Sequence, residues 1–175
     1  THEFWSEFSA ALESDENPPL LVGEAGAELD IAATYFGQES AKEMGMVFDF
    51  DGASAMLQST LSEKTTPLRQ AWCKRWAQSV PWGTWGTFLS NHDQDRVATV
   101  MQGEPPRRLK TAAALLLLSP GTPWIYYGEE IGATNGNSWG DMGRREPMHW
   151  NPGNSEFSAA EPWTGSEDQP AYASV

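Results

Sequence analysis

The chain has 175 residues, with 11 basic and 24 acidic side chains and a formal net charge of -13. This acidic balance argues against nucleic acid or an anionic membrane as a partner, because both bind basic surfaces. No apolar run reaches the roughly 20 residues of a membrane-spanning helix. Cys73 is the only cysteine, which excludes an internal disulfide, and its neighbours predict a buried helix position without a functional role. The cellular compartment is left open.

The first third of the chain predicts a helix, a strand and a second strand. Apolar residues at helical spacing predict a helix over residues 2–14. A strand is expected over residues 20–23, and it ends at Glu24. Residues 27–43 read as irregular. A second short, buried strand is expected over residues 46–50, again with acidic residues, Asp49 and Asp51, at its end.

The remainder predicts two further strands, each preceded by a helix. Residues 53–61 are weakly helical, and a stronger helix is expected over residues 66–79. In this helix Thr66 is the expected N-cap and Pro67 the first helical residue. Strands are expected over residues 87–90 and 124–127, with a helix that opens at Pro105 and Pro106 between them. The expected buried stripe of the 66–79 helix comprises Leu68, Ala71, Trp72 and Trp76.

Four short apolar strands that alternate with helices predict an α/β fold with parallel strands and crossover helices. A doubly wound sheet and a (β/α) barrel both satisfy this pattern. The periodicity of the sequence does not distinguish them.

Two carboxylates follow apolar strands far apart in the sequence, Glu24 and Asp93. The carboxyl ends of parallel strands form the active-site edge of α/β enzymes, and a pair of carboxylates suits glycoside hydrolysis. A glutamate behind an apolar run is expected to be desolvated, which raises its pKa and suits a general acid. His92 is placed to bind sugar hydroxyls. In the alternative interpretation, Glu24 is an ordinary loop residue, and His92 and Arg96 form a network that only holds a loop.

Four motifs in order resemble the α-amylase superfamily of retaining glycosidases. They are Val22-Gly-Glu-Ala25, Asn91-His-Asp-Gln94 followed by Arg96, residues 121–132, and Arg145-Glu-Pro-Met148 followed by Trp150. The last of these is similar to a segment of the α-glucosidase-like members, and it favours short oligosaccharides over starch.

The resemblance implies a partial (β/α)8 TIM barrel with about strands five to eight. Residues 1–132 would form half of the catalytic barrel and residues 133–175 a long loop region over the site. By resemblance Glu24 is the general acid/base and Asp93 the second carboxylate, which stabilises the transition state. His92 and Arg96 would be substrate-binding residues. No cofactor and no metal are expected.

The sequence departs from the family at the nucleophile, because the Gly-x-Arg-x-Asp pattern of the fourth strand and the Asp-x-x-x-x-His pattern of the third are absent. Asp49, Asp51 and Asp95 could be proposed as stand-in nucleophiles, but none of them occupies the family position. A whole barrel also takes about 250 residues. We therefore expect part of the catalytic domain of an α-glucoside or α-glucan hydrolase or transglycosylase, inactive alone.

The expected partner of such a half-barrel is the missing amino-terminal half or a second copy of the chain, since an open sheet leaves edges and one face uncovered. Two alternatives stay open. One is a non-catalytic carbohydrate-binding or assembly module derived from the same fold. The other is an unrelated α/β protein in which the motifs arise by chance.

Overall fold

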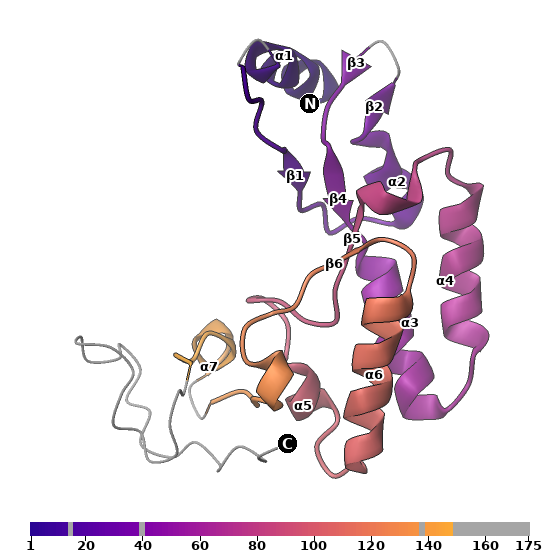
Figure 1. Cartoon of the computed structure of the whole chain (residues 1–175), viewed down its shortest axis with the longest axis vertical. Coiled ribbons are helices and arrows are strands. Elements are labelled where there is room, and N and C mark those ends of the chain that lie inside the picture. The colour runs from indigo at the N-terminus through magenta and orange to yellow at the C-terminus, as the bar shows by residue number, and fades with distance from the viewer. Residues whose placement is uncertain (14–15, 39–40, 137–138, 149–175) are drawn as a thin grey trace. The chain divides into compact units, whose positions relative to one another are not determined.

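The computed structural model describes residues 1–13, 16–38, 41–136 and 139–148. The chain divides into two compact units. The first comprises Thr1–Phe88 and Ala114–Trp124, and the second comprises Leu89–Ala113 and the residues from Ile125 onward. The elements, labelled in Figure 1, are α1 (His2–Leu12), β1 (Val22–Gly23), α2 (Leu29–Thr34), β2 (Gly37–Gln38), β3 (Ala41–Lys42), β4 (Met46–Phe48), α3 (Phe50–Ser62), α4 (Thr66–Ala77), β5 (Trp85–Thr87), α5 (Val97–Val100), α6 (Pro106–Leu118), β6 (Thr122–Pro123) and α7 (Asp141–Arg144).

The first unit is built on a four-stranded sheet in the order β1-β4-β5-β6, in which every neighbouring pair is parallel. This confirms the predicted parallel α/β fold. The spatial order of the strands is also their order along the chain. A doubly wound sheet reverses direction at a switch point, whereas a barrel adds each strand on the same side of the last. The order therefore favours the barrel over the doubly wound sheet.

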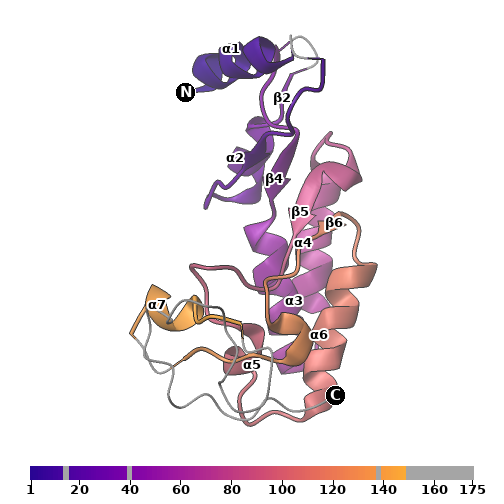
Figure 2. The same ribbon diagram turned by 60° about the vertical axis from the view of Figure 1, so that its left-hand side comes forward.

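Helical segments connect the parallel strands. The chain passes through α3 and α4 between β4 and β5, and these two helices lie side by side in both views (Figures 1 and 2). Helix α4 begins one residue earlier than its sequence suggested. Its N-cap is Thr65, which makes no side-chain capping bond, and the proline lies within the first two helical positions.

The two faces of β4 pack against different aromatic groups. Val47 is fully buried in a cluster with Leu29, Ala32 and Trp85. The next residue along the strand, Phe48, points to the opposite face, as strand geometry requires. Its ring makes edge contacts with Phe88 at 5.5 Å and Trp124 at 5.1 Å between centroids.

A glycine fits opposite Phe48 because a side chain there would collide with both rings of this aromatic contact. Gly86 is the register partner of Phe48 across the β4–β5 pair. A Cβ atom at Gly86 would lie 2.9 Å from the Phe48 ring and 3.3 Å from Nε1 of Trp124. The rings of Phe48 and Trp124 can thus pack over β5 because Gly86 has no side chain at that position.

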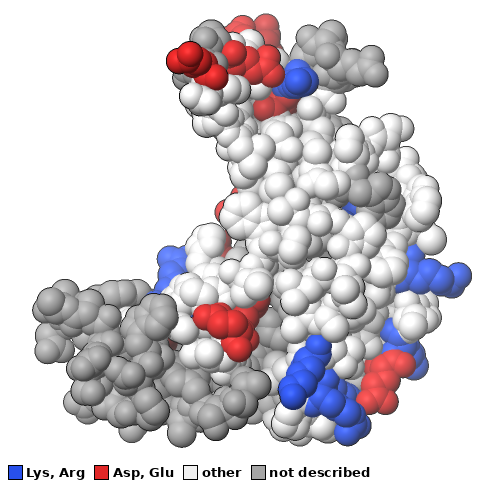
Figure 3. Space-filling model, viewed as in Figure 1, with Lys and Arg blue, Asp and Glu red and all other residues white. Residues whose placement is uncertain are grey.

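Helix α1 is held to the β2–β3 hairpin by a polar contact. Nδ1 of His2 lies 2.8 Å from a carboxylate oxygen of Glu43, which is 5% exposed. Figure 3 shows acidic side chains gathered over the outer surface of this helix. Among the described residues, no helix is both long and apolar enough to cross a bilayer.

Several sequence predictions were wrong in detail. Residues 27–43, expected to be irregular, contain α2 and the β2–β3 hairpin. The strand expected over residues 124–127 is instead β6, two residues earlier, and β5 ends where the predicted strand begins. Cys73 is exposed rather than buried. The long loop region expected over residues 133–175 stays a prediction. Of this region the structure describes residues 133–136 and 139–148, which include the short helix α7. Residues 137–138 and 149–175, including Trp150, lie outside the described part.

The predicted buried stripe of α4 was wrong for one tryptophan. Trp76 is 75% exposed, whereas Leu68, Ala71 and Arg75 are the buried residues of this helix. The burial of Arg75 shifts the inward face away from the position that apolar spacing alone indicated.

Candidate functional site

Glu24 follows β1 directly, at the carboxyl end of that strand, in the first unit. Its side chain is exposed. The expectation that an apolar strand would desolvate this carboxyl is therefore wrong, because β1 is only two residues long and Glu24 already lies in the loop beyond it. An exposed carboxylate at a strand exit is nevertheless accessible to a substrate.

The loop that follows β5 carries the other three predicted site residues, His92, Asp93 and Arg96, and these lie in the second unit. The side chain of Asn91 shapes its turn, because its Oδ1 accepts the Asp93 N–H at 3.0 Å. His92 and Asp93 are both exposed, with Nε2 of the imidazole 3.4 Å from Oδ1 of the carboxylate. An imidazole and a carboxylate that face solvent side by side can both bind hydroxyl groups.

Arg96 supports this loop from within. It is 2% exposed. Its guanidinium carbon lies 4.8 Å and 4.6 Å from the ring centroids of Tyr126 and Tyr127, and Nη1 donates to the Tyr127 carbonyl at 2.6 Å. Its backbone N–H donates to Oδ1 of Asn135 at 2.8 Å. In this geometry Arg96 fixes the loop and does not face solvent, which is the loop-holding alternative that the sequence left open.

The outer side of the same loop is bound by two arginines at the end of α7. Nη2 of Arg145 lies 2.5 Å from Oδ1 of Asp93, and Nε of Arg145 donates to the His92 carbonyl at 3.0 Å. Nε of Arg144 lies 2.9 Å from Oδ1 of Asp95, and its Nη1 donates to the Asp93 carbonyl at 2.8 Å. The hydrogen bond from Arg144 lowers the pKa of the Asp95 carboxyl, with a second contribution from Asn135.

Glu129 is a half-buried carboxyl of the second unit that accepts two hydrogen bonds. The hydroxyl of Ser90 donates to Oε1 of Glu129, and the Tyr126 N–H donates to Oε2 at 3.3 Å. Burial raises the pKa of Glu129, and this outweighs the opposing hydrogen bonds and the charge of Arg96. Burial also raises the pKa of the Tyr126 hydroxyl, which donates to the Arg144 carbonyl at 3.2 Å.

The three aspartates considered as stand-in nucleophiles all have other partners. Asp49 is 2% exposed and pairs with Arg75 at 2.8 Å. Asp51 pairs with Lys74 at 3.4 Å, and Asp95 pairs with Arg144. These contacts give each aspartate a structural partner in the fold.

Three carboxylates in this part of the second unit, Asp93, Asp95 and Asp141, each form an ion pair with an arginine. The guanidinium groups therefore neutralise much of the negative charge that these aspartates carry.

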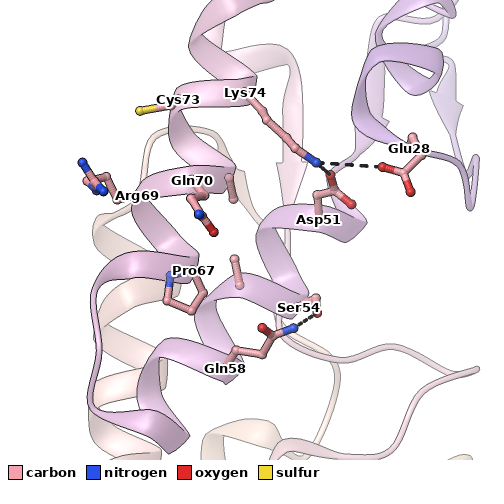
Figure 4. Close-up of a pocket in the computed structure, with 11 residues that line it drawn as sticks. Glu28, Asp51, Ser54, Gln58, Pro67, Arg69, Gln70, Cys73 and Lys74 are labelled. Atoms are coloured by element: carbon pink, nitrogen blue, oxygen red, sulfur yellow. Dashed lines mark hydrogen bonds and ion pairs between the residues drawn. The ribbon is translucent and has the colours of Figure 1, made fainter.

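A groove of about 910 Å³ lies between α3 and α4 (Figure 4). The cation at its upper end is Lys74, which is paired with Asp51 at 3.4 Å and with Glu28 at 3.9 Å. Two other lining side chains form a hydrogen bond, in which Nε2 of Gln58 donates to Oγ of Ser54 at 2.8 Å. The groove is part of the helical layer and is not lined by any of the predicted site residues.

Sequence reasoning missed Arg144, Asn135 and Asp141 as parts of the loop network. They lie between the motifs that carried the resemblance, and 39 to 51 residues separate Asn135 and Arg144 from their partners on the loop. A spacing rule for one element does not detect such contacts. Adjacent arginines in a strongly acidic chain were only a weak signal, because Arg107 and Arg108 show the same pattern as Arg144 and Arg145.

A singly wound parallel sheet with carboxylates beyond its strand ends is the arrangement of a (β/α)-barrel enzyme domain. The chain belongs to the α-amylase family, since a family model for the alpha-amylase catalytic domain matches residues 1–174.

Relatives of known activity are similar over most of the chain. A glucan 1,6-alpha-glucosidase from Streptococcus dysgalactiae subsp. equisimilis is 33% identical over 146 residues, which is 77% of this chain and 27% of that protein. An oligo-1,6-glucosidase from Halalkalibacterium halodurans is 34% identical over 125 residues, 66% of this chain and 22% of that protein. The chain thus spans about a quarter of the length of these two relatives.

Solved structures show the same fold. The alpha-amylase from H. orenii superimposes with a TM-score of 0.78 and 26% identity, over 94% of this chain and 33% of that one. An alpha-amylase from Geobacillus thermoleovorans, solved with acarbose, gives a TM-score of 0.67 at 27% identity over 83% of this chain and 33% of that one. Family membership and the barrel fold confirm the resemblance read from the sequence.

Proposed function

We propose that the chain supplies the carboxyl-terminal half, about strands five to eight, of the catalytic barrel of a retaining α-glycoside hydrolase or transglycosylase. Its substrates would be α-glucosides or α-glucans. The observation that carries the proposal is the sheet order β1-β4-β5-β6, with candidate site carboxylates beyond the carboxyl ends of two of its parallel strands. A relative named as an oligo-1,6-glucosidase supports a preference for short α-glucosides.

In the proposed mechanism Glu24 is the general acid/base and Asp93 the carboxylate that stabilises the oxocarbenium-like transition state. Glu24 protonates the leaving glycosidic oxygen and later takes a proton from the attacking water or sugar hydroxyl. Asp93 and His92 bind the hydroxyls of the same ring. Arg96 does not bind the sugar in this mechanism, because its guanidinium packs against the rings of Tyr126 and Tyr127. Its role is to hold the loop that carries His92 and Asp93.

The nucleophile comes from outside these 175 residues. The sequence has no Gly-x-Arg-x-Asp pattern, and the fold employs Asp49, Asp51 and Asp95 in ion pairs. The chain alone is therefore expected to be inactive, and a complementary half-barrel or a second copy would complete the sheet. Leu20, which is 60% exposed before β1, and Trp124, which is 42% exposed after β6, flank the two edge strands that such a partner would cover.

Turnover of an aryl α-glucoside and of maltose tests the proposal. We would measure both with the purified 175-residue chain and with the complete polypeptide that carries it. The proposal is supported if the complete polypeptide turns over these substrates and the 175-residue chain alone does not. Turnover by the chain alone would show that it supplies its own nucleophile, and no turnover by either would argue against a catalytic role.

A second function, a non-catalytic carbohydrate-binding or assembly module, is favoured by one observation, the missing nucleophile pattern. It predicts saturable binding of maltose by the 175-residue chain, and no turnover by the complete polypeptide. Calorimetric titration with maltose, carried out beside the turnover assay, separates the two functions.

A further inference from the structure

Charged side chains of α7 and of Arg145, the residue after it, bind the outside of the Asp93 loop. We call Asp141, Arg144 and Arg145 the α7 clip. Asp141 pairs with both arginines, with its Oδ1 3.0 Å from Nη1 of Arg144 and its Oδ2 3.3 Å from Nη2 of Arg145. The arginines are thereby held in place before they reach the loop.

The two arginines of the α7 clip contact the loop differently. Arg145 reaches the carboxylate of Asp93 itself. Arg144 does not touch that carboxylate. Its Nε lies 2.9 Å from Oδ1 of Asp95, and its Nη1 donates to the Asp93 carbonyl at 2.8 Å. The planar guanidinium therefore bridges a side chain and a backbone carbonyl of the loop. A planar fork of this kind constrains orientation more than a point charge does.

Asp95 links this outer contact to the inner support. Its Oδ1 also accepts from Nδ2 of Asn135 at 2.8 Å, and Oδ1 of the same asparagine accepts the Arg96 N–H. The backbone N–H of Asn135 donates to the Thr99 hydroxyl at 2.6 Å. Oδ1 of Asp95 therefore has two partners, the guanidinium of Arg144 and the side-chain amide of Asn135. Both interactions hold the loop at this residue.

We propose that Arg144 is a positioning residue that orients Asp93 through Asp95 and the Asp93 carbonyl, and that the α7 clip is an ionic device sensitive to salt. The inference rests on the role of Asp93 proposed above. The clip residues and their loop partners are exposed by 26% to 53%. The Debye length shortens from about 10 Å at 0.1 M salt to about 3 Å at 1 M, so salt weakens the clip while the buried Arg96 support persists.

Amide hydrogen exchange in the 175-residue chain tests the clip without any need for activity. In Arg144→Gln we expect the Asp93 and Arg145 amides to exchange roughly 10-fold faster, while the Arg96 amide is unchanged because its acceptor, Asn135, remains. In the unsubstituted chain, 1 M salt should reproduce the effect. Arg69→Gln, an exposed arginine of α4, is the matched control. Equal exchange in Arg144→Gln and in the control would overturn the clip.

Kinetics of the complete polypeptide test the positioning role. We expect Arg144→Gln to lower kcat by roughly 10- to 100-fold, the order expected for a small misplacement of a reacting group, with little change in KM. Arg144→Lys should fail to restore kcat, because an ammonium cannot bridge Asp95 and the Asp93 carbonyl with fixed geometry. Full rescue by lysine would show that only the charge matters and would overturn positioning.

A double substitution shows through which residue Arg144 acts. In an Asp95→Asn background, Arg144→Gln should have a clearly smaller effect on kcat than in the parent, since one of the two bridged points is already lost. Strictly multiplicative effects would contradict action through Asp95. If Asp93→Asn leaves turnover unchanged, the proposed function of Asp93 fails, whereas the exchange experiment still decides whether the clip exists.

Discussion

Arg75 on α4 and Asp49 at the end of β4 form a buried ion pair with 2.8 Å between Nη2 and Oδ2, and each residue is 2% exposed. The other oxygen of Asp49 accepts the Gly52 N–H at 2.7 Å and so caps α3. The other terminal nitrogen of Arg75 donates to the Pro120 carbonyl at 2.6 Å, two residues before β6. One pair thus ties a strand end, two helices and the turn that leads into the edge strand.

Loss of one partner of this pair should destabilise the first unit strongly. Arg75→Met leaves the Asp49 carboxylate buried without its cation, which costs about 3–5 kcal/mol of unfolding free energy in comparable cases. Urea unfolding followed by tryptophan fluorescence measures the loss. Lys74→Met is the matched control on the adjacent position, because its pairs with Asp51 and Glu28 are exposed and such pairs contribute about 1 kcal/mol or less. Similar losses in the two variants would contradict a special role for the buried pair.

Helix α4 shows where sequence reasoning succeeds and where it stops. Its existence and length follow from the proline near its start and from the residues Leu68 and Ala71, which are buried as predicted. The choice between Trp76 and Arg75 as the inward residue does not follow from hydrophobicity. The arginine can be buried here because it forms an ion pair with Asp49, which lies 26 residues earlier in the chain. A local sequence pattern does not reveal so distant a partner.

The end of β6 gives a similar lesson for the site. Tyr126 and Tyr127 were expected in a strand because aromatic residues favour strands. In the structure their rings flank the guanidinium of Arg96 instead, and their hydroxyls donate to the carbonyls of Arg144 and Glu146. The position of the candidate loop after β5 could thus be predicted from apolar runs, whereas the groups that hold it come from distant segments.

Replacement of the proposed acid/base should remove activity and spare the fold. In the complete polypeptide we expect Glu24→Gln to lower kcat/KM by roughly 10²- to 10⁴-fold, the usual contribution of general acid–base catalysis. Its unfolding free energy should change little because the side chain is exposed. Initial rates on an aryl α-glucoside and on maltose measure the effect, with Glu28→Gln as the control at an exposed glutamate of the next helix start. Wild-type rates in Glu24→Gln would refute the assignment.

Glu129 should make stability depend on pH in a defined direction. Burial raises the pKa of this carboxyl above its ordinary 4.5, so the folded chain holds the proton more tightly than the unfolded chain. The resulting stabilisation is complete below about pH 4.5 and is lost as the pH rises through the folded-state pKa. Compared with Glu129→Gln, which cannot titrate, the parent chain should therefore lose unfolding free energy from pH 4 toward pH 7.

Urea unfolding at several pH values measures this difference between the parent chain and Glu129→Gln. Asp49, whose pKa is raised by burial against the charge of Arg75, contributes with the same sign, but it is present in both proteins and cancels. The exposed neighbour supplies the control substitution, Glu130→Gln. A difference that stays constant across the pH range would contradict the burial argument.

Gly128 and Gly132 flank a short helical turn. Substitutions at these two positions separate the backbone strain of a side chain at positive φ from the steric clash of that side chain with its neighbours. Both have positive φ, 86° and 70°, but a Cβ at Gly128 would lie 2.9 Å from the Ala133 Cβ and 3.0 Å from Nη1 of Arg96, whereas one at Gly132 meets nothing within 4 Å. Gly132→Ala should therefore cost about 1–2 kcal/mol, the backbone penalty alone. Gly128→Ala should cost about 1–3 kcal/mol more, because overpacking displaces Arg96 from the two tyrosines. Equal unfolding free energies for the two variants would mean that Arg96 moves freely and does not hold the Asp93 loop.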